Sequence, residues 1–259
     1  MARRTGNQTD GETAPRPGPR SAGNTRSAPA ESGKAGVVTA QQIVKTAVRI
    51  CDERGLEFLT IRRLANDLDI GAMTLYNYFR SKDEILDGIA DHVLGSLQIP
   101  PMADPTPAGM ARNVAGALFA MMREHPSVVH LLSNRTTMSE RALEVAMDHV
   151  IGALREAGFS DEGSVRAYAL IMTYCLGFSS YQMPRDWGPD HVEGVDELRR
   201  RKRHFYASLP LPQCANLVEL SAMVTTMPSD NQFRFGLDCL IAGLTTQPGV
   251  VSVRSPSPA

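Results

Sequence analysis

Cysteine is scarce in this sequence of 259 residues, and the few that occur are far apart. They form no C-x-x-C pair and have no histidine at zinc-ligand spacing, so the sequence does not indicate a zinc site. We expect reduced core residues at Cys51, Cys175, Cys214 and Cys239. The alternative is a redox-sensing thiol at Cys51, whose basic neighbours are Arg49 and Arg54.

Long apolar runs are also missing. The longest, roughly residues 168–178, is much shorter than the ~18 residues that a membrane-spanning helix needs, which excludes a transmembrane protein. Residues 1–36 contain no large hydrophobic residue besides Met1, so no secretory signal is readable. We therefore expect a cytoplasmic protein with no membrane partner.

Common catalytic motifs are absent as well. The sequence has no G-x-S-x-G, no glycine-rich phosphate loop and no H-E-x-x-H, and its six histidines pair with no nucleophile at readable spacing. An enzyme is therefore not indicated.

Net charge is almost zero, at -1, but the charges are unevenly distributed. Residues 1–82 carry 13 Lys and Arg against 8 Asp and Glu, whereas residues 83–259 carry 14 against 20. The basic front is compatible with a nucleic acid partner. A second basic run, residues 199–204, follows Glu193, Asp196 and Glu197, and we interpret it as a solvated helix face.

Apolar residues recur at the 3.6-residue spacing of helices between two polar ends, and no strand-like alternation is visible. Residues 1–36 are rich in Pro and Gly and predict a disordered basic tail, and residues 248–259 predict a second tail. The core between them is expected to be all-α.

Capping signals divide the first part of this core into four helices. Thr39 with Gln42 forms a capping box for a helix that ends at Gly55. Thr60 caps a short helix that ends at the turn 69–71, and a third short helix covers residues 72–79. Ser81 with Glu84 forms a second box and begins a helix that continues to residue 97, before Pro100 and Pro101.

Two short helices joined by a glycine-containing turn have the helix-turn-helix geometry. The stretch LTIRRLANDLDIGAMTLYNYFRSKDEIL, residues 59–86, resembles the DNA-binding domain of the tetracycline-repressor (TetR) family. More weakly, residues 158–178 and 233–244 resemble the ligand-binding domain of the tetracycline-repressor branch. The resemblance implies a three-helix helix-turn-helix domain over residues 37–82 and a helical ligand-binding and dimerisation domain over residues 83–247.

The recognition helix supplies the candidate base contacts. An Asn side chain pairs with adenine, and the methyl groups of Thr and Met contact thymine. The base-reading residues are expected to be Ala72, Met73, Thr74, Tyr76 and Asn77. Tyr78 either contacts DNA, as the resemblance implies, or covers the core, and Leu75 and Phe79 are expected to pack inward.

Phosphate contacts are expected beside these base readers. Hydroxyl groups, helix N-termini and basic side chains hold phosphates without reading sequence. The candidates are Thr60, Arg62, Arg63 and Lys82. The alternative for each arginine is a solvated basic face.

A ligand site is expected in the C-terminal domain. Ten of the twelve methionines lie beyond residue 100, and methionine packs readily around irregular ligands. We expect an apolar cavity lined by Leu118, Met121 and Met172.

The resemblance adds two polar residues to this ligand site. His130 and Glu162 fall where the tetracycline repressor has a magnesium-coordinating histidine and a partner-subunit glutamate, so magnesium could accompany the ligand, although no cofactor is otherwise indicated. Val114 and Gln98 replace the asparagine and histidine that grip the drug in that repressor, so tetracycline itself is not expected. Without a metal, His130 would be a pocket or surface histidine and Glu162 a carboxylate at a helix N-terminus.

The resemblance also implies a homodimer that forms through helices at 164–181 and 231–245, where Gly236 and Gly243 would allow close packing. The sequence thus predicts a ligand-responsive transcriptional regulator, a repressor released from a palindromic operator by a small apolar ligand. The alternative is a small-molecule-binding or interaction protein of the same fold without specific DNA binding, because Ala72 and Met73 make the base-reading face apolar.

Overall fold

The computed structural model describes residues 38–103, 105–134, 139–182 and 195–252. Apart from one isolated β-bridge between Phe159 and Val251, all the regular structure in these ranges is helical, which confirms the all-α expectation. No helix within them is long and apolar enough to cross a membrane.

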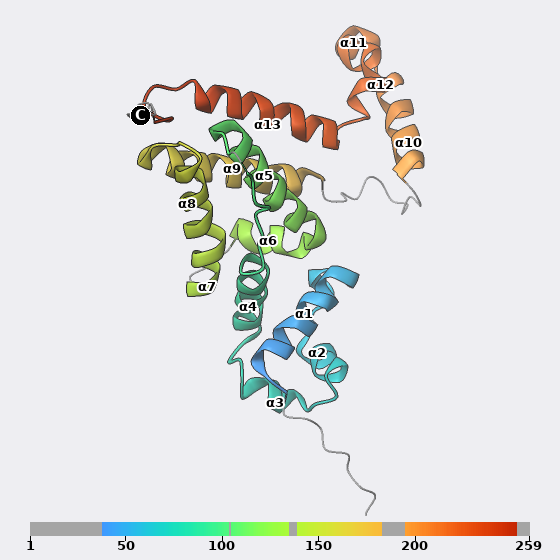
Figure 1. The fold of residues 1–259 in the computed structure, drawn as a ribbon. Helices are drawn as coiled ribbons and strands as arrows, with labels where there is room; N and C mark the ends of the chain where they lie inside the picture. Colours follow the sequence, from blue (N-terminus) through green and yellow to red (C-terminus); the bar gives the residue numbers. More distant parts are fainter. Residues whose placement is uncertain (1–37, 104, 135–138, 183–194, 253–259) are drawn as a thin grey trace, which may run out of the picture. The chain divides into compact units, whose positions relative to one another are not determined.

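The first helices in chain order are α1 (Ala40–Arg54), the 3₁₀ turn η1 (Leu56–Phe58), α2 (Ile61–Asp67), α3 (Ala72–Tyr76) and α4 (Lys82–Leu94) (Figure 1). The middle of the chain forms α5 (Pro107–Glu124), α6 (Pro126–Asn134), α7 (Glu140–Leu143), the π-helical turn η2 (Glu144–Asp148), α8 (His149–Glu156) and α9 (Asp161–Gln182). The last helices are α10 (Val195–Ala207), α11 (Leu211–Glu219), α12 (Ser221–Val224) and α13 (Asp230–Thr245).

The predicted helix starts are present. Thr39 and Gln42 form the reciprocal capping box at α1, and the Thr60 side chain accepts a hydrogen bond from the Arg63 backbone N–H at 3.1 Å. Ser81 caps α4, but the Glu84 carboxylate accepts from the Arg80 N–H rather than from Ser81. The second capping box is therefore only half formed.

Two helices end earlier than expected. The recognition helix α3 ends at Tyr76, because the Asn77 N–H bonds to the Thr74 carbonyl three residues back and tightens the last turn. Helix α4 ends at Leu94, although Leu97 beyond it is still buried.

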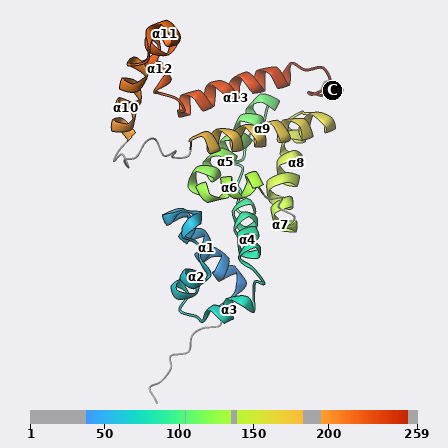
Figure 2. The ribbon, with the colours of Figure 1, turned by 180° about the vertical axis from the view of Figure 1, so that it is seen from behind.

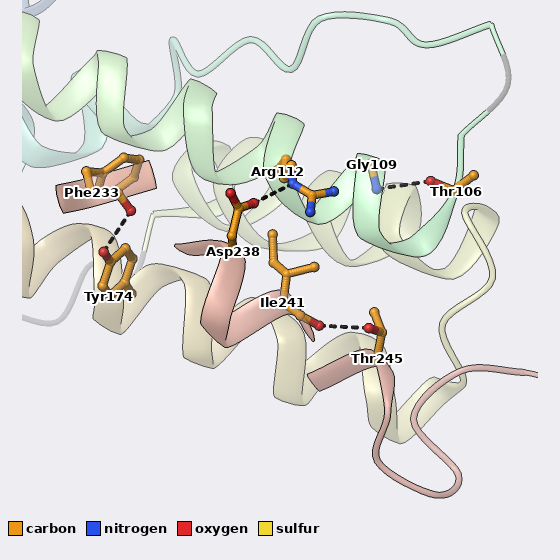
Figure 3. A network of polar contacts seen from close by, with 8 residues as sticks. All are labelled: Thr106, Gly109, Arg112, Tyr174, Phe233, Asp238, Ile241 and Thr245. Carbon is orange, nitrogen blue, oxygen red and sulfur yellow. Dashed lines mark hydrogen bonds and ion pairs between the residues drawn. The ribbon is translucent and has the colours of Figure 1, made fainter. Parts of the chain in front are cut away.

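Helix α5 packs against α9 and α13 in the C-terminal part (Figure 2). Aromatic side chains join the three helices: the rings of Phe119 and Phe233 stack at 3.8 Å, and Phe178 meets Phe233 edge-on at 5.3 Å. Polar contacts also join these helices. The Tyr174 hydroxyl on α9 donates to the Phe233 carbonyl on α13 at 2.9 Å, and Arg112 on α5 pairs with Asp238 on α13 at 2.8 Å (Figure 3). These contacts fix α13 on the body of the chain.

The start predicted for the second tail is wrong, because residues 248–252 pack against the rest of the chain. Val250 is buried, and its carbonyl accepts from the Ser160 N–H at 2.9 Å. The Ser252 N–H donates to the Gly158 carbonyl at 2.8 Å. Residues 248–252 are thus packed on the turn between α8 and α9, while residues 1–36 and 253–259 of the predicted tails lie outside the described residues.

The cysteines are only partly core residues. Cys51 and Cys175 are buried, whereas Cys214 is partly exposed and Cys239 is exposed, so the core expectation is wrong for the last two. Burial raises the pKa of Cys51 to about 11, with the nearby Asp52 adding to the effect. Because the thiolate is the reactive form, this environment argues against a redox sensor at Cys51.

Candidate DNA-reading surface and effector groove

The α2–turn–α3 segment has helix-turn-helix form. Leu64 and Ala65 bury the inner side of α2, and the chain reverses through Asp69, whose φ of 53° lies in the left-handed region that Asp tolerates. The Ile70 N–H bonds to the Ala65 carbonyl at 3.0 Å and closes the turn. Helix α3 therefore starts directly after Gly71 with its orientation fixed by the core.

The predicted base-reading residues lie mostly on the outer surface of this segment. The side chain of Leu75 is buried, so the opposite side of α3 faces solvent. Met73 is 77% exposed, Thr74 is half-buried, and the remaining candidates, Ala72, Tyr76 and Asn77, are exposed.

Two of the candidates lie differently from the sequence expectation. Asn77 is the C-cap of α3 and not an interior helical residue, and Tyr78 lies in the turn that follows. Tyr78 is 39% exposed, while Phe79 is partly buried against the core. Base contacts of Asn77 and Tyr78 would thus come from the C-terminal end of α3.

The predicted phosphate-binding residues flank α3. Arg62 and Lys82 are exposed, and Lys82 opens α4, where the helix dipole also favours an anion. The Nε atom of Arg63 is buried without a hydrogen-bond partner among the described residues. Thr60 uses its oxygen to cap α2 and retains its O–H as a donor.

A groove of about 480 Å³ lies beside α5, and we refer to it as the effector groove. Its walls are the segment 96–100, which follows α4, the solvent-facing side of α5, and His125, the residue that ends α5. Its lining combines polar and apolar side chains: Ser96, Leu97, Gln98, Pro100, Arg112, Asn113, Gly116, Ala117, Ala120, Met121, Glu124 and His125. The Asn113 amide donates to the Pro100 carbonyl at 2.6 Å and holds the two walls together.

The predicted ligand residues are spread over several places. Met121 lines the effector groove, whereas Leu118 is fully buried in the core beside it and Met172 is partly buried on α9. His130 is exposed on α6, and Glu162 is exposed at the start of α9, where it pairs with Arg166. The five predicted ligand-binding residues therefore do not meet at one site within a single chain.

A metal site is not evident within the described part of the chain, where no three His, Cys, Asp or Glu side chains are grouped to hold an ion. A metal at His130 would need ligands from elsewhere, such as the effector itself or a partner subunit. The arrangement of this chain alone gives no support for magnesium.

A second hollow of about 400 Å³ lies across the segment that follows α4, and it shares Leu97 and Pro100 with the effector groove. Met102 and Met110 supply apolar surface, and Val145 and His149 come from η2 and the start of α8. The π-helical turn thus contributes directly to this wall, and such turns are frequent at functional sites.

A contact that the sequence did not predict joins the effector groove to α1. The Nδ1 atom of His125 lies 2.7 Å from one carboxylate oxygen of Asp52, and the Ser127 hydroxyl lies 3.3 Å from the other. The His125 and Asp52 side chains are only 19% and 22% exposed. The His125-Pro126 pair marks the helix break between α5 and α6, but its partner is 73 residues away in the sequence.

Helices α9 and α13 each carry an exposed apolar face, as the predicted dimer requires. Val165 on α9 is 50% exposed, and Phe235 on α13 is 67% exposed, with Ala242 and Gly243 exposed nearby. Gly236 differs from the expectation: a Cβ there would lie 2.3 Å from the Tyr174 hydroxyl of the same chain. Its small size is therefore needed within the subunit.

Comparison with known proteins agrees with this geometry. The family model described as "Bacterial regulatory proteins, tetR family" matches residues 43–89, and "Tetracyclin repressor-like, C-terminal domain" matches residues 108–247. The chain is 29% identical to the HTH-type transcriptional repressor DrrR1 of Streptomyces coeruleorubidus over 213 residues, covering 80% of this chain and 77% of the relative.

Solved structures give the same result. The TetR family protein ActR of Streptomyces coelicolor in complex with actinorhodin is 30% identical, with a TM-score of 0.66 and coverage of 81% of this chain and 96% of ActR. ActR in complex with (S)-DNPA matches at 30% identity, with a TM-score of 0.64 and coverage of 81% and 98%. Because one family model alone spans more than half of the sequence, the chain belongs to the TetR family, and it is a helix-turn-helix transcriptional regulator that binds DNA as a homodimer.

Proposed function

We propose that this regulator is a repressor that holds a palindromic operator in its free form and leaves it when an organic effector enters the effector groove. The observation that carries the proposal is the position of the groove beside the residues that follow α4, since only residues 77–81 separate α4 from the recognition helix. The repressor DrrR1 and the ligand complexes of ActR support it by similarity. The protein would act in the cytoplasm and catalyse no reaction.

The groove lining favours an effector with polar substituents, unlike the small apolar ligand expected from the sequence. Gln98, Arg112 and Asn113 offer donors and acceptors, while Leu97 and Met121 offer apolar surface. A hydroxylated aromatic molecule matches this mixture, because a few polar groups orient a ligand that apolar surface binds. Actinorhodin, which ActR binds, is the first probe to test.

On the DNA side, we propose that residues 37–82 read the operator, with phosphate contacts from Thr60, Arg62, Arg63 and Lys82. Base contacts would come from the exposed side and the C-terminal end of α3. Residues 83–247 would bind the effector and form the dimer.

The experiment measures binding to the DNA upstream of the protein's own gene and to a scrambled fragment, by fluorescence anisotropy at several salt concentrations. Arg62→Ala should weaken binding to both DNAs and reduce the salt slope by about two units, because one phosphate contact is lost in each of the two half-sites. Asn77→Ala should lower only the preference for the upstream fragment. Arg155→Ala, which removes an exposed ion pair on α8, is the matched control.

Effector binding is tested by calorimetry with actinorhodin. Linkage requires the upstream DNA to weaken actinorhodin binding by the same factor by which actinorhodin weakens DNA binding. A chelator together with His130→Ala tests the magnesium proposal, which is wrong if neither changes the affinity. Equal binding to both DNA fragments would refute the operator proposal and favour a small-molecule-binding protein, an outcome that the exposed apolar side chain of Met73 makes worth testing.

A further inference from the structure

The connection between α5 and α6 makes two contacts with α1 that involve the same side chain. Asp52 lies in the last turn of α1, and its two carboxylate oxygens are bound separately by His125 at 2.7 Å and Ser127 at 3.3 Å. His125 ends α5 and Ser127 is the second residue of α6. One carboxylate therefore ties the last turn of α1 to the junction between two helices of the effector-binding domain.

The surroundings make this contact more than a surface ion pair. Both side chains are about four-fifths buried, so water competes weakly for their hydrogen bonds. His92 on α4 is among the titratable groups near this contact, and its pKa is lowered first by burial and then by Lys45 and His125. Losing the contact would leave Asp52 partly buried without its partners, which is unfavourable.

The same histidine also lines the effector groove, one turn after Met121. Because Nδ1 of the ring is engaged by Asp52, Nε2 is the ring nitrogen that an effector can bind. An effector hydroxyl that binds Nε2, or any group that displaces the ring, would act directly on the contact with Asp52.

The same end of α1 is also connected to the reading element. Arg49, one turn before Asp52, pairs with Asp67 at 3.0 Å, and Asp67 is the last residue of α2. The turn to α3 follows immediately. A displacement of the last turn of α1 would therefore reach the segment that orients the recognition helix.

We propose that His125 and Asp52 couple occupancy of the effector groove to the position of α1, and so to the orientation of α3. His125 is a positioning residue that senses the occupant on one side and holds α1 on the other. The inference rests on the proposed function, because it specifies how the effector releases DNA.

The test fills the effector groove with a substituted side chain in place of a bound effector. Ala120 lines the effector groove and is exposed, so Ala120→Trp places an aromatic ring there without disturbing the core. Affinity for the upstream DNA is measured for the wild-type protein, Ala120→Trp, Asp52→Ala and the double variant. Asp230→Ala removes an exposed carboxylate, which pairs with Arg123 near the end of α5 but belongs to α13, and serves as the control background.

Ala120→Trp should weaken DNA binding about tenfold in the wild-type and Asp230→Ala backgrounds, within the usual range of allosteric coupling. In the Asp52→Ala background the same substitution should change affinity less than about twofold, because the connection is cut. Amide exchange in the last turn of α1 should also become faster in Ala120→Trp and not change further in the double variant.

An equal effect of Ala120→Trp with and without Asp52 would overturn the inference, and so would the absence of any effect in the wild-type background. A purely structural role of Asp52 would lower stability without altering the response to Ala120→Trp. That result is an equal effect in both backgrounds, and it would also overturn the inference. If the wild-type protein does not prefer its upstream DNA, the proposed function itself fails, which separates the two.

Discussion

Gly236 is the position where the seating of α13 can be tested most directly. A Cβ atom there would lie 2.3 Å from the Tyr174 hydroxyl and 3.1 Å from Cζ of the same ring. The first distance is far below van der Waals contact, so Gly236→Ala requires the ring or the helix to move. Because the hydroxyl is bonded to the Phe233 carbonyl, the ring is not free to swing away (Figure 3).

The expected cost follows from these distances. Inserting a methyl group into a packed site costs about 1–3 kcal/mol, while replacing Gly by Ala in a helix gains about 1 kcal/mol. Gly236→Ala should therefore be destabilising by up to about 2 kcal/mol. Tyr174→Phe alone removes one hydrogen bond, at a cost of about 1 kcal/mol.

Combining the two changes should relieve the clash. Without the hydroxyl, the nearest ring atom lies 3.1 Å from the new Cβ, a gap that small shifts accommodate. The double variant should hence be more stable than the sum of the single changes predicts, by about 1 kcal/mol. The measurement is urea unfolding at fixed protein concentration, since dimer formation contributes to stability.

Gly152→Ala on α8 provides the control, because nothing lies within 4 Å of a Cβ at that position. It should stabilise the protein by about 0.5–1 kcal/mol through helix propensity alone. If Gly236→Ala were as favourable as Gly152→Ala, or if its effect added simply to that of Tyr174→Phe, the described packing of α13 on α9 would be wrong.

Three further outcomes are expected. Ala242→Arg should give folded monomers in sedimentation equilibrium, because this exposed position lies on the predicted dimer face, and an unchanged mass would remove α13 from the interface. Iodoacetamide should label Cys239 faster in that variant than in the wild-type dimer, whereas the buried Cys51, whose pKa is raised to about 11, stays unlabelled until unfolding. Burial, helped by neighbouring positive charge, lowers the pKa of His92 below its ordinary 6.5, so the unfolded chain takes up the proton first and stability should fall as pH drops below about 6.5. His92→Gln should flatten that part of the pH profile.

The sequence predicted best those features that depend on hydrogen bonds between near neighbours. The caps at Thr39, Thr60 and Ser81 are local, since each side chain bonds a backbone N–H three residues later. The burial of Leu75 also follows from local sequence, because helical periodicity alone assigns this residue to the inner face of its helix.

What the sequence missed depends on contacts between distant segments. Val250 is held by the turn before α9, about ninety residues earlier in the chain. The sequence does not show this contact, and the polar residues around Val250 predicted a tail. Met121 lines the effector groove, whereas Leu118, which was expected beside it, packs into the core, because the face that α5 turns to α9 is set by tertiary packing. Asp52 and His125 carry no sequence signal that pairs them.

The recognition helix α3 has one further consequence, which concerns evolution. The helix packs against the core through the side chain of Leu75, while the side chains of Ala72, Met73 and Tyr76 are exposed to solvent. Exposed substitutions usually change stability by no more than about 0.5 kcal/mol. If these three positions read the operator, as proposed, a duplicated copy of the gene can sample new residues there while keeping its fold, its dimer and its effector, and so bring the same chemical signal to a different set of promoters.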